Sequence, residues 1–416
     1  MKQARALALL HAGRNVFLTG PAGSGKTTVL NKFIKLARKE GKKVAVTAST
    51  GIAATHLNGT TIHSWAGIGI ADRLNAYQLD ELEQKQYLHK RFLETDVLVI
   101  DEVSMLHSYR LDLIDLVLRS VAQKDEPFAG IQVVLAGDFF QLPPVSRGVS
   151  NEQYYAFEAH VWGGLNLAVC YLDTIHRQAK DPLLKVLQEL RHGEMSEESE
   201  ELLQERMDTQ LPDNITPTKL YTHNIDVDKV NKEYLDDLSE KLEVFSMTSK
   251  GKKNYVKILQ KYCLAPQKLE LKVGAQIMFI KNNFTEEYVN GTMGTIIDFD
   301  HGSPVVETTE GKKIIVQPDS WAYDQAGSAV AKITQLPLRL AWAITVHKSQ
   351  GMTLDVVEVD LSKSFAAGMG YVALSRVKTL RGLYIKGINR QALAVDPLVK
   401  KHDELFQEQS TQLEKN

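Results

Sequence analysis

The sequence predicts an α/β fold in which helices wrap a parallel sheet. The apolar run at Val16–Leu18 leads directly into a glycine-rich segment at 20–27, and a helix-forming stretch follows it. Further short apolar runs occur at Lys42–Thr50, Asp96–Ile100 and Gln132–Ala136, with helix-like stretches between them. Strands that alternate with helices at this spacing are typical of a parallel sheet. Ligands of such folds collect beyond the carboxyl ends of the strands.

The glycine-rich segment GPAGSGKT fits the pattern G-x-x-x-x-G-K-[ST] without a deviation. Its glycines let backbone N–H groups wrap around phosphate oxygens, and the helix from Thr28 to Lys39 adds its positive dipole end. Lys26 is expected to reach the β- and γ-phosphates, and the Thr27 hydroxyl to hold Mg²⁺. The alternative is a strand-to-helix turn that binds nothing, but the intact GKT favours a nucleoside triphosphate. The nucleotide-binding candidates of this segment are Gly20, Ala22, Gly23, Ser24, Gly25, Lys26, Thr27 and Thr28.

Composition sets broad limits on domain number and class. A chain of 416 residues predicts about two to four domains. Its 44% apolar and 24% charged content is ordinary for a soluble globular protein. A net charge of −2 argues against an overall electrostatic grip on nucleic acid, although a local basic groove stays compatible with it. Cys170 and Cys263 indicate neither a disulfide framework nor a zinc site, and no signal peptide or membrane span is evident, so a cytoplasmic protein is expected.

The remaining elements of the first half follow in order. Lys2–His11 predicts an amphipathic helix, and Gly51–Ala54 begins another helix after the second strand. The polar, glycine-rich stretch Gly59–Trp65 suits a surface loop. Residues Ala71–His89 resemble a small charged helical insertion, and Tyr109–Ala122 predicts a longer helix.

Polar side chains at two strand ends carry the expected chemistry. Asp101 closes the third strand, where a Walker B carboxylate accepts Mg²⁺, usually through water. Glu102 comes next and can orient and deprotonate the attacking water; the alternative is a plain acidic turn. Gln141 follows the fourth strand, and its neutral amide can bond a γ-phosphate and respond to its loss.

Four segments make the resemblance to a known family specific. VLVIDEVSML, VLAGDFFQLPPV, AITVHKSQGMTLD (Ala343–Asp355) and GYVALSRVK (Gly370–Lys378) resemble motifs II, III, V and VI of superfamily 1B helicases. Within that group the chain resembles the PIF (petite integration frequency) helicases, whose signature segment ends in a pattern like PFGGIQ. Here Tyr109–Gln132 ends in PFAGIQ, with Ala129 as the one departure. The match runs from Gln3 to about Leu383.

The resemblance implies two RecA-like P-loop NTPase domains with parallel sheets and one small insertion in each. The implied domains are 1–170 with a helical wedge insertion at about 66–92, then 171–239 and 335–400, with an SH3-like β insertion at 240–334 and a charged tail at 401–416. Strand-like runs at Gln276–Ile280, Gly294–Phe299 and Gly311–Val316 fit that insertion, whose alternative is an unrelated β-rich insert. The parallel-sheet pattern is expected to return at Leu336–Ile344. Lys400–Asn416 is expected to be disordered.

Further site residues come from the resemblance alone. Arg177 of motif IV and Arg376 of motif VI are the implied arginine fingers, and Gln3 is the implied reader of adenine. The strand-binding candidates are Thr50, Gly51, His63, Ser64, Thr345 and His347, and the remaining nucleotide contact is Gly351. Trp65 and Phe139 could stack bases. Core positions are the alternative for both aromatics, structural roles for His63 and His347, and surface positions for the two arginines.

These observations predict an enzyme, an ATP-dependent DNA helicase that uses Mg²⁺ and moves 5′ to 3′ on single-stranded DNA. Its expected partners are single-stranded DNA and single/double-strand junctions, with no membrane, and a monomer is expected. The family implies work in DNA repair, recombination and telomere maintenance. Two alternatives stay open: an ATP-gated single-strand binding protein that does not unwind, and an RNA-directed motor.

Overall fold

The computed structural model describes residues 1–57, 59–69, 71–144, 155–175, 181–212, 217–281, 283, 286, 288, 291–325 and 328–415. The chain forms two compact units. The first contains Met1–Leu211, Thr353–Asp355 and Leu361–Asn416, and the second contains Pro212–Met352 and Val356–Asp360. The boundaries of the two motor domains stay a prediction. No helix in the described part of the chain is both long and apolar enough to cross a membrane.

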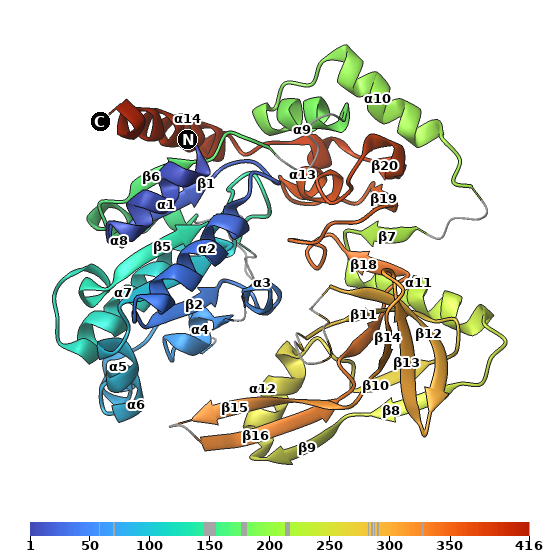
Figure 1. The fold of residues 1–416 in the computed structure, drawn as a ribbon, viewed down its shortest axis with the longest axis horizontal. Coiled ribbons are helices and arrows are strands. Elements are labelled where there is room, and N and C mark those ends of the chain that lie inside the picture. The colour runs from blue at the N-terminus through green and yellow to red at the C-terminus, as the bar shows by residue number, and fades with distance from the viewer. Residues whose placement is uncertain are drawn as a thin grey trace. The chain divides into compact units, whose positions relative to one another are not determined.

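A six-stranded parallel sheet organises the first unit (Figure 1). Its order is β3-β2-β4-β5-β1-β6, and every pairing within it is parallel. The strands are β1 (Val16–Thr19), β2 (Val44–Ala48), β3 (Thr60–Thr61), β4 (Val97–Asp101), β5 (Gln132–Ala136) and β6 (Ala168–Tyr171). The four strands expected in the first half are all present, and the prediction of a parallel sheet is confirmed.

The strands of this sheet carry apolar side chains on both faces, so helices cover both faces. α1 (Gln3–His11) and α2 (Lys26–Lys39) pack on one face, where Leu10 and Phe33 join a core cluster with Val16 and Val99. Phe17 alternates to the opposite face and contacts the rings of Trp162 and Phe406. Phe17, Phe139, Phe157, Trp162 and Phe406 form an aromatic cluster on that second face.

The first unit contains further helices and one strand beyond the sheet. These are α3 (Gly51–His56), α4 (Ile62–Trp65), α5 (Ala76–Glu83), α6 (Gln86–Leu93), α7 (Ser108–Ala122), α8 (His160–Gly164), α9 (Leu183–His192), α10 (Glu197–Asp208), α13 (Met369–Leu374), α14 (Pro397–Lys415) and β20 (Leu383–Ile388). Short 3-10 turns lie at Val103–Met105, Pro127–Gly130, Ala156–Glu158, Leu380–Gly382 and Arg390–Leu393. α5 and α6 form the expected helical insertion. The 3-10 turn at Pro127–Gly130 explains the glycine of the family pattern, because Ala129 there has a left-handed φ of 55°.

Two expectations for the first unit are wrong. Gly59–Trp65 is not a surface loop, because it forms β3 and α4 and buries Ile62 and Trp65. The segment expected to be disordered from Lys400 onward forms most of α14. That helix buries Val399, Phe406 and Ser410, so a few well-placed side chains outweigh its charged composition.

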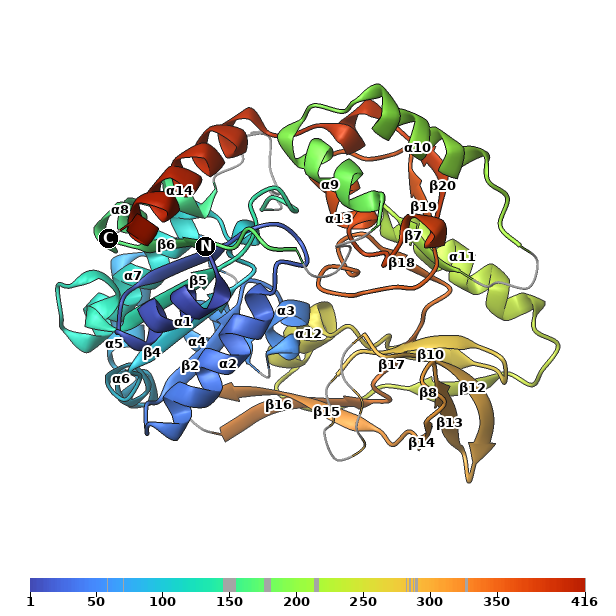
Figure 2. The same cartoon turned by 45° about the horizontal axis from the view of Figure 1, so that its top comes forward.

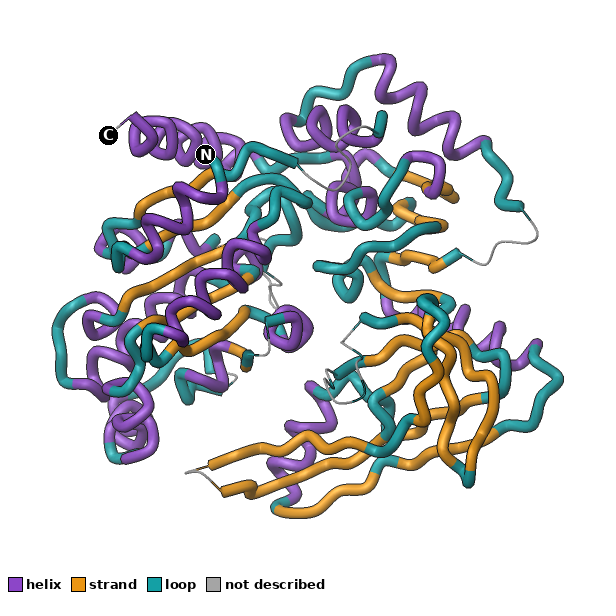
Figure 3. Tube along the Cα trace, in the orientation of Figure 1, coloured by secondary structure: helices purple, strands orange, loops and turns teal. Residues whose placement is uncertain are grey.

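Antiparallel strands dominate the second unit (Figures 2 and 3). A five-stranded sheet has the order β14-β13-β12-β11-β17, β9 joins the hairpin of β15 and β16, and β8 pairs with β10. The strands are β8 (Glu243–Ser246), β9 (Thr248–Gly251), β10 (Lys268–Leu271), β11 (Gln276–Phe279), β12 (Met293–Asp300), β13 (Ser303–Thr308), β14 (Lys313–Ile315), β15 (Asp319–Gln325), β16 (Ser328–Gln335) and β17 (Leu338–Leu340). The expected strands of this region are present, and their SH3-like closure stays a prediction.

A parallel arrangement returns later than expected. β7 (Thr218–Tyr221) pairs in parallel with β18 (Ala343–Thr345) and with β19 (Val357–Leu361). Within Leu336–Ile344, however, β17 pairs antiparallel with β11, so the parallel pattern begins only at β18. The helices of this unit are α11 (Asn224–Asp237) and α12 (Lys253–Tyr262).

Candidate active site

The phosphate loop lies between β1 and α2, as the sequence predicts. Gly20, Gly23 and Gly25 all have positive φ, at 136°, 81° and 89°. A Cβ placed on Gly20 would lie 2.3 Å from the backbone oxygen of Leu172, which no side chain tolerates. Glycine is therefore required at Gly20 by both conformation and space.

Lys26, the first residue of α2, turns its ammonium group back onto the loop. Its Nζ donates hydrogen bonds to Gly20 O at 2.7 Å and to Pro21 O at 3.1 Å. Burial lowers the pKa of Lys26, whereas the charges of Asp138 and Glu102 raise it. The Lys26 ammonium group thus lies beside a loop whose N–H groups can bind phosphate oxygens, which is the arrangement that holds a triphosphate.

Neighbouring side chains of the loop fit the predicted roles in part. Gln3 Nε2 donates to Ser24 O at 3.1 Å, so the first turn of α1 contacts the loop directly. Thr27 and Thr28 are exposed at the start of α2 and are accessible to a ligand, whereas Ser24 is buried. The reading of adenine by Gln3 stays a prediction.

Asp101 and Glu102 form a carboxylate pair at the end of β4. Asp101 is buried, and its Oδ1 accepts a hydrogen bond from Glu102 N at 2.9 Å. Burial, followed by the charge of Glu102, raises the pKa of Asp101 to about 7. Glu102 has a left-handed φ of 51°, and its carbonyl oxygen accepts from Ser49 Oγ at 2.6 Å. The turn is thus fixed in a strained conformation, as is common at functional sites.

This pair fits a divalent cation. A buried carboxyl whose pKa is raised by a neighbouring negative charge gains from a cation that both groups can approach. The described residues contain no cluster of three or more His, Cys, Asp or Glu side chains able to hold a metal. Mg²⁺ keeps several waters and takes only one or two carboxylates together with substrate phosphates, which a pair such as Asp101 and Glu102 can supply. Asp101 and the Thr27 hydroxyl are the residues that would hold it.

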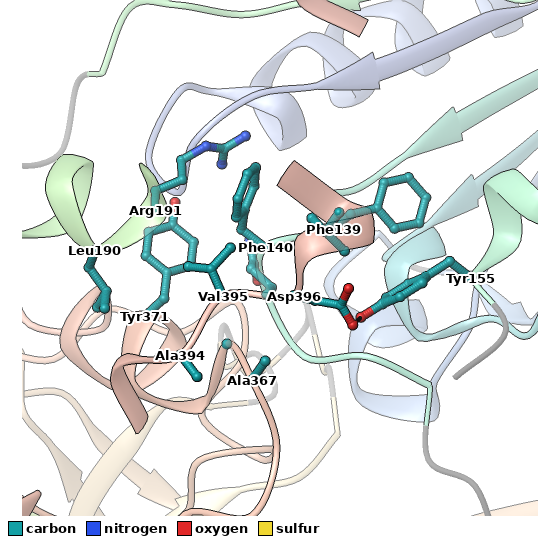
Figure 4. Close-up of a pocket in the computed structure, with 13 residues that line it drawn as sticks. Phe139, Phe140, Tyr155, Leu190, Arg191, Ala367, Tyr371, Ala394, Val395 and Asp396 are labelled. Carbon is teal, nitrogen blue, oxygen red and sulfur yellow. Dashed lines mark hydrogen bonds between the residues drawn. The ribbon is translucent and has the colours of Figure 1, made fainter. Parts of the chain in front are cut away.

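Gln141 lies beside a residue that the sequence analysis missed. Asp138 is fully buried. Its backbone carbonyl oxygen accepts a hydrogen bond from Gln141 N at 2.9 Å, and its carboxylate Oδ1 accepts one from Arg191 Nη1 at 2.7 Å. Gln141, Arg191 and Tyr371 line one pocket (Figure 4). The signal for Asp138 was its place after a buried strand, like that of Asp101. Arg191 and Tyr371 gave no local signal, because their partners are distant in sequence.

Of the two candidate arginine fingers, the structure describes Arg376. Arg376 is 2% exposed and bonds within its own segment, from Nε to Val372 O at 2.9 Å and from Nη2 to Ser375 Oγ at 2.7 Å. Arg177 lies outside the described residues. The remaining nucleotide candidate, Gly351, belongs to the second unit and has a φ of 81°.

The strand-binding candidates of the first unit lie at the start of α3 and in α4. Thr50 Oγ1 accepts from Ala53 N at 3.2 Å, and Gly51 and Ser64 are exposed. His63 Nε2 lies 3.3 Å from Arg110 Nη1. Burial, with the Arg110 charge, lowers the pKa of His63 to about 4, so its imidazole is neutral at physiological pH.

Both aromatic candidates are packed against other rings. Trp65 is 7% exposed and packs against Phe92 at a ring-centroid distance of 5.1 Å. Phe139 is 5% exposed and lies against Phe17 and Phe157. Their packing agrees with the alternative of core positions, and a role in stacking on bases stays a prediction.

Thr345 and His347 follow β18 in the second unit. Thr345 is 3% exposed, and its hydroxyl accepts from Lys348 N at 3.3 Å, which shapes the turn after the strand. Burial, with a smaller effect of His223, lowers the pKa of His347. Both histidines among the strand-binding candidates therefore favour the neutral form.

Comparisons with known proteins match one family over most of this chain. A family model described as PIF1-like helicase matches residues 2–201, and a model of the DNA helicase Pif1 2B domain matches 254–299. ATP-dependent DNA helicase Pif1 of Psychrobacter sp. (strain PRwf-1) is 42% identical over 99% of this chain and 71% of its own length. The Bdellovibrio bacteriovorus protein of that name is 34% identical over 96% of this chain and 90% of its own length. The human PIF1 helicase is 37% identical, but this chain spans only 62% of its length.

Solved structures show the same architecture. The crystal structure of Pif1 helicase from Candida albicans covers 97% of this chain and 98% of its own, with 34% identity and a TM-score of 0.87. A Bacteroides Pif1 helicase in complex with ADP-AlF3 and single-stranded DNA covers 98% of this chain and 96% of its own, with 31% identity and a TM-score of 0.77. The predicted α/β fold of the helicase family is thereby confirmed.

Proposed function

Because this chain belongs to the Pif1 family of ATP-dependent DNA helicases, we propose that it couples Mg-ATP hydrolysis to 5′-to-3′ movement along single-stranded DNA and to unwinding of duplex ahead of it. The observation that carries the proposal is the convergence of the phosphate loop, Lys26 and the pair Asp101–Glu102 within one unit. This chain spans 71% of the length of its Psychrobacter relative and 62% of the length of its human relative. The activity of those longer proteins is therefore a proposal for this chain.

Each group has a defined task in the proposed reaction. The loop N–H groups and Lys26 hold the phosphates, while Thr27 and Asp101 hold Mg²⁺, which would stabilise the charge that develops on the phosphates. Glu102 accepts a proton from the attacking water. Gln141, next to the buried Asp138, contacts the γ-phosphate. Arg376 and Arg177 supply positive charge to the transferred phosphoryl group, a contribution worth roughly three to five orders of magnitude in turnover.

The DNA side of the proposal rests on small polar groups. Thr50, Gly51 and Ser64 offer hydroxyl and backbone N–H groups, which suit contacts to phosphates without reading bases. Thr345 and His347 extend the set in the second unit. We also propose that one chain is the active species on single-stranded DNA. One solved relative is described as two coordinating Pif1 helicases on forked DNA, so stoichiometry on single strands and on forks should be measured separately.

The deciding experiment uses duplexes with a single-stranded tail on only one side. Displacement with a 5′ tail and little with a 3′ tail supports the proposal, and the reverse result overturns its direction. ATP hydrolysis without displacement on either substrate would indicate a gated binding protein. Stimulation of hydrolysis by RNA oligomers in preference to DNA would indicate an RNA-directed motor.

A further inference from the structure

A chain of buried hydrogen bonds leads from the phosphate loop into the core of the first unit. The hydroxyl of Tyr371 accepts a hydrogen bond from Ala22 N at 2.8 Å and donates one to Asp138 Oδ2 at 3.2 Å. Asp138 Oδ1 accepts from Arg191 Nη1 at 2.7 Å, and Arg191 Nη2 donates to Asp403 Oδ1 at 3.0 Å. Tyr371, Asp138, Arg191 and Asp403 are all less than a tenth exposed.

Local packing holds this network in one arrangement. Arg191 Nη2 also donates to the Tyr171 hydroxyl at 2.8 Å, and the guanidinium lies 4.2 Å from the centroid of the Phe140 ring. Arg191 thus meets two carboxylates, one hydroxyl and one aromatic face. Figure 4 shows its guanidinium beside the Phe140 ring. Buried charges with this many partners leave little room for rearrangement.

We propose that Tyr371 is a positioning residue of the phosphate loop, and that Asp138 and Arg191 hold its hydroxyl in place. This inference deepens the proposed function and rests on the nucleotide site described above. The Tyr371 hydroxyl bonds to the loop backbone at Ala22 N, so its proposed effect on the nucleotide passes through that backbone. Nothing in the helicase motifs as sequence patterns identifies the tyrosine as more than a core residue of α13.

The Tyr371 hydroxyl fixes the orientation of one peptide of the phosphate loop. The Ala22 N–H belongs to the loop that wraps the phosphates, and here it points at a side chain from a distant part of the chain. Fixing that N–H fixes the orientation of the Pro21–Ala22 peptide, whose Pro21 carbonyl accepts from Lys26 Nζ at 3.1 Å. One hydroxyl therefore sets both a loop peptide and the acceptor of the loop lysine.

Burial keeps Tyr371 in the form that this role requires. Burial and the charge of Asp138 raise the pKa of the Tyr371 hydroxyl far above physiological pH. The neutral hydroxyl can accept from Ala22 and donate to Asp138 at once. Phenylalanine would retain the ring but lose both hydrogen bonds.

The test compares Tyr371→Phe with Tyr155→Phe. Tyr155 is a matched control, because it is also buried and its hydroxyl donates to a carboxylate, Asp396 Oδ2 at 2.9 Å. Equilibrium binding of a fluorescent ATP analogue and steady-state ATPase kinetics are measured for both. Tyr371→Phe should weaken nucleotide binding and raise KM for ATP by roughly three- to tenfold, the value of one lost hydrogen bond, with a much smaller change in kcat.

The control should bind nucleotide like the wild type, since the hydroxyl that it loses donates to Asp396 and not to Asp138. Equal binding by Tyr371→Phe and the wild type would overturn the proposal, as would an equal loss in both variants, which would indicate general loosening of the core. If Tyr371→Phe does not fold, Arg191→Lys takes its place: weaker nucleotide binding supports the network, and unchanged binding refutes it.

This readout separates the inference from the proposed function. Binding of the analogue requires neither hydrolysis nor DNA. A wild-type chain that binds the analogue but fails to unwind tailed duplexes would contradict only the helicase proposal. A wild type that unwinds while Tyr371→Phe binds normally would contradict only the role of Tyr371.

Discussion

Two neighbouring carboxyl groups after β4 have different surroundings and therefore different roles. Asp101 is buried and has a pKa raised to about 7, so it gains most from a cation. Glu102 has a left-handed backbone, is partly exposed, and is held through its carbonyl by Ser49. The first suits metal binding, and the second suits proton transfer with water.

Substitution of Lys26 and of Glu102 should separate binding from hydrolysis. Lys26→Ala removes the ammonium group at the loop and should weaken ATP binding and cripple turnover. Glu102→Gln retains size and hydrogen bonding but cannot accept a proton, so ATP should bind normally while hydrolysis falls by at least roughly a hundredfold, in the range of general-base losses. Single-strand-stimulated ATPase and analogue binding measure both effects. Full turnover by Glu102→Gln would remove its assigned role.

His63 predicts a pH dependence of stability. Its folded-state pKa of about 4 lies below its ordinary value of 6.5, so the unfolded chain binds more protons between these values. The contribution of His63 to stability is therefore fully present above about pH 6.5 and is lost as the pH falls toward 4. Melting temperatures from pH 7 to 4.5 should fall less steeply for His63→Gln than for the wild type. Parallel curves would show that another group sets the slope.

At the scale of elements, sequence reasoning succeeded where the signal is local. β1, the glycine loop and α2 follow each other without interruption, so their geometry could be predicted from one stretch. The loop expected at Gly59–Trp65 was misjudged because its polar residues hide two buried side chains, Ile62 and Trp65. β17 looked like the start of a parallel strand, but its pairing with β11 is decided by long-range register.

The same reasoning explains the missed parts of the candidate site. Asp138 lies in the loop after β5, and Arg191, Tyr371 and Asp403 come from α9, α13 and α14, so only folding brings them together. Phe139 shows that a residue inside a helicase motif can pack in the core. Burial depends on partners that no local pattern shows.

α14 supplies a prediction at this scale. Phe406 packs against Phe17 at 5.0 Å and against Trp162 at 6.2 Å between ring centroids, and it is 6% exposed. Phe406→Ala should destabilise the first unit by about 3 kcal/mol through lost contacts and a cavity. Leu405→Ala is the matched control, because Leu405 is 44% exposed on the same helix and should have little effect. Denaturant unfolding measures both, and equal losses would contradict the docking of this face.

At the scale of the whole molecule, the low net charge of −2 and the neutral strand-binding candidates belong together. The pKa of both His63 and His347 is lowered, and the rest of the set carries hydroxyl or backbone groups. We expect such a surface to bind the DNA backbone by hydrogen bonds more than by cations. Few counterions would then be released on binding.

Salt titration of single-strand binding tests this view. Affinity should fall as salt rises, with a slope of log Kd against log salt shallower than about 2, since each neutralised phosphate contributes roughly 0.7 on a single strand. Unwinding should weaken in parallel. A much steeper slope would show that lysines and arginines outside the candidate set carry the grip.

The docking of α14 has a further consequence for association between chains. β6 ends the order of the six-stranded sheet, and an uncovered edge strand is a template for pairing with another chain. α14 lies against β6, where Ser410 Oγ accepts from Tyr171 N at 3.1 Å and occupies a donor that a foreign strand would seek. α14 therefore shields this edge strand from pairing with another chain, and we expect loss of its docking to cause aggregation that light scattering detects.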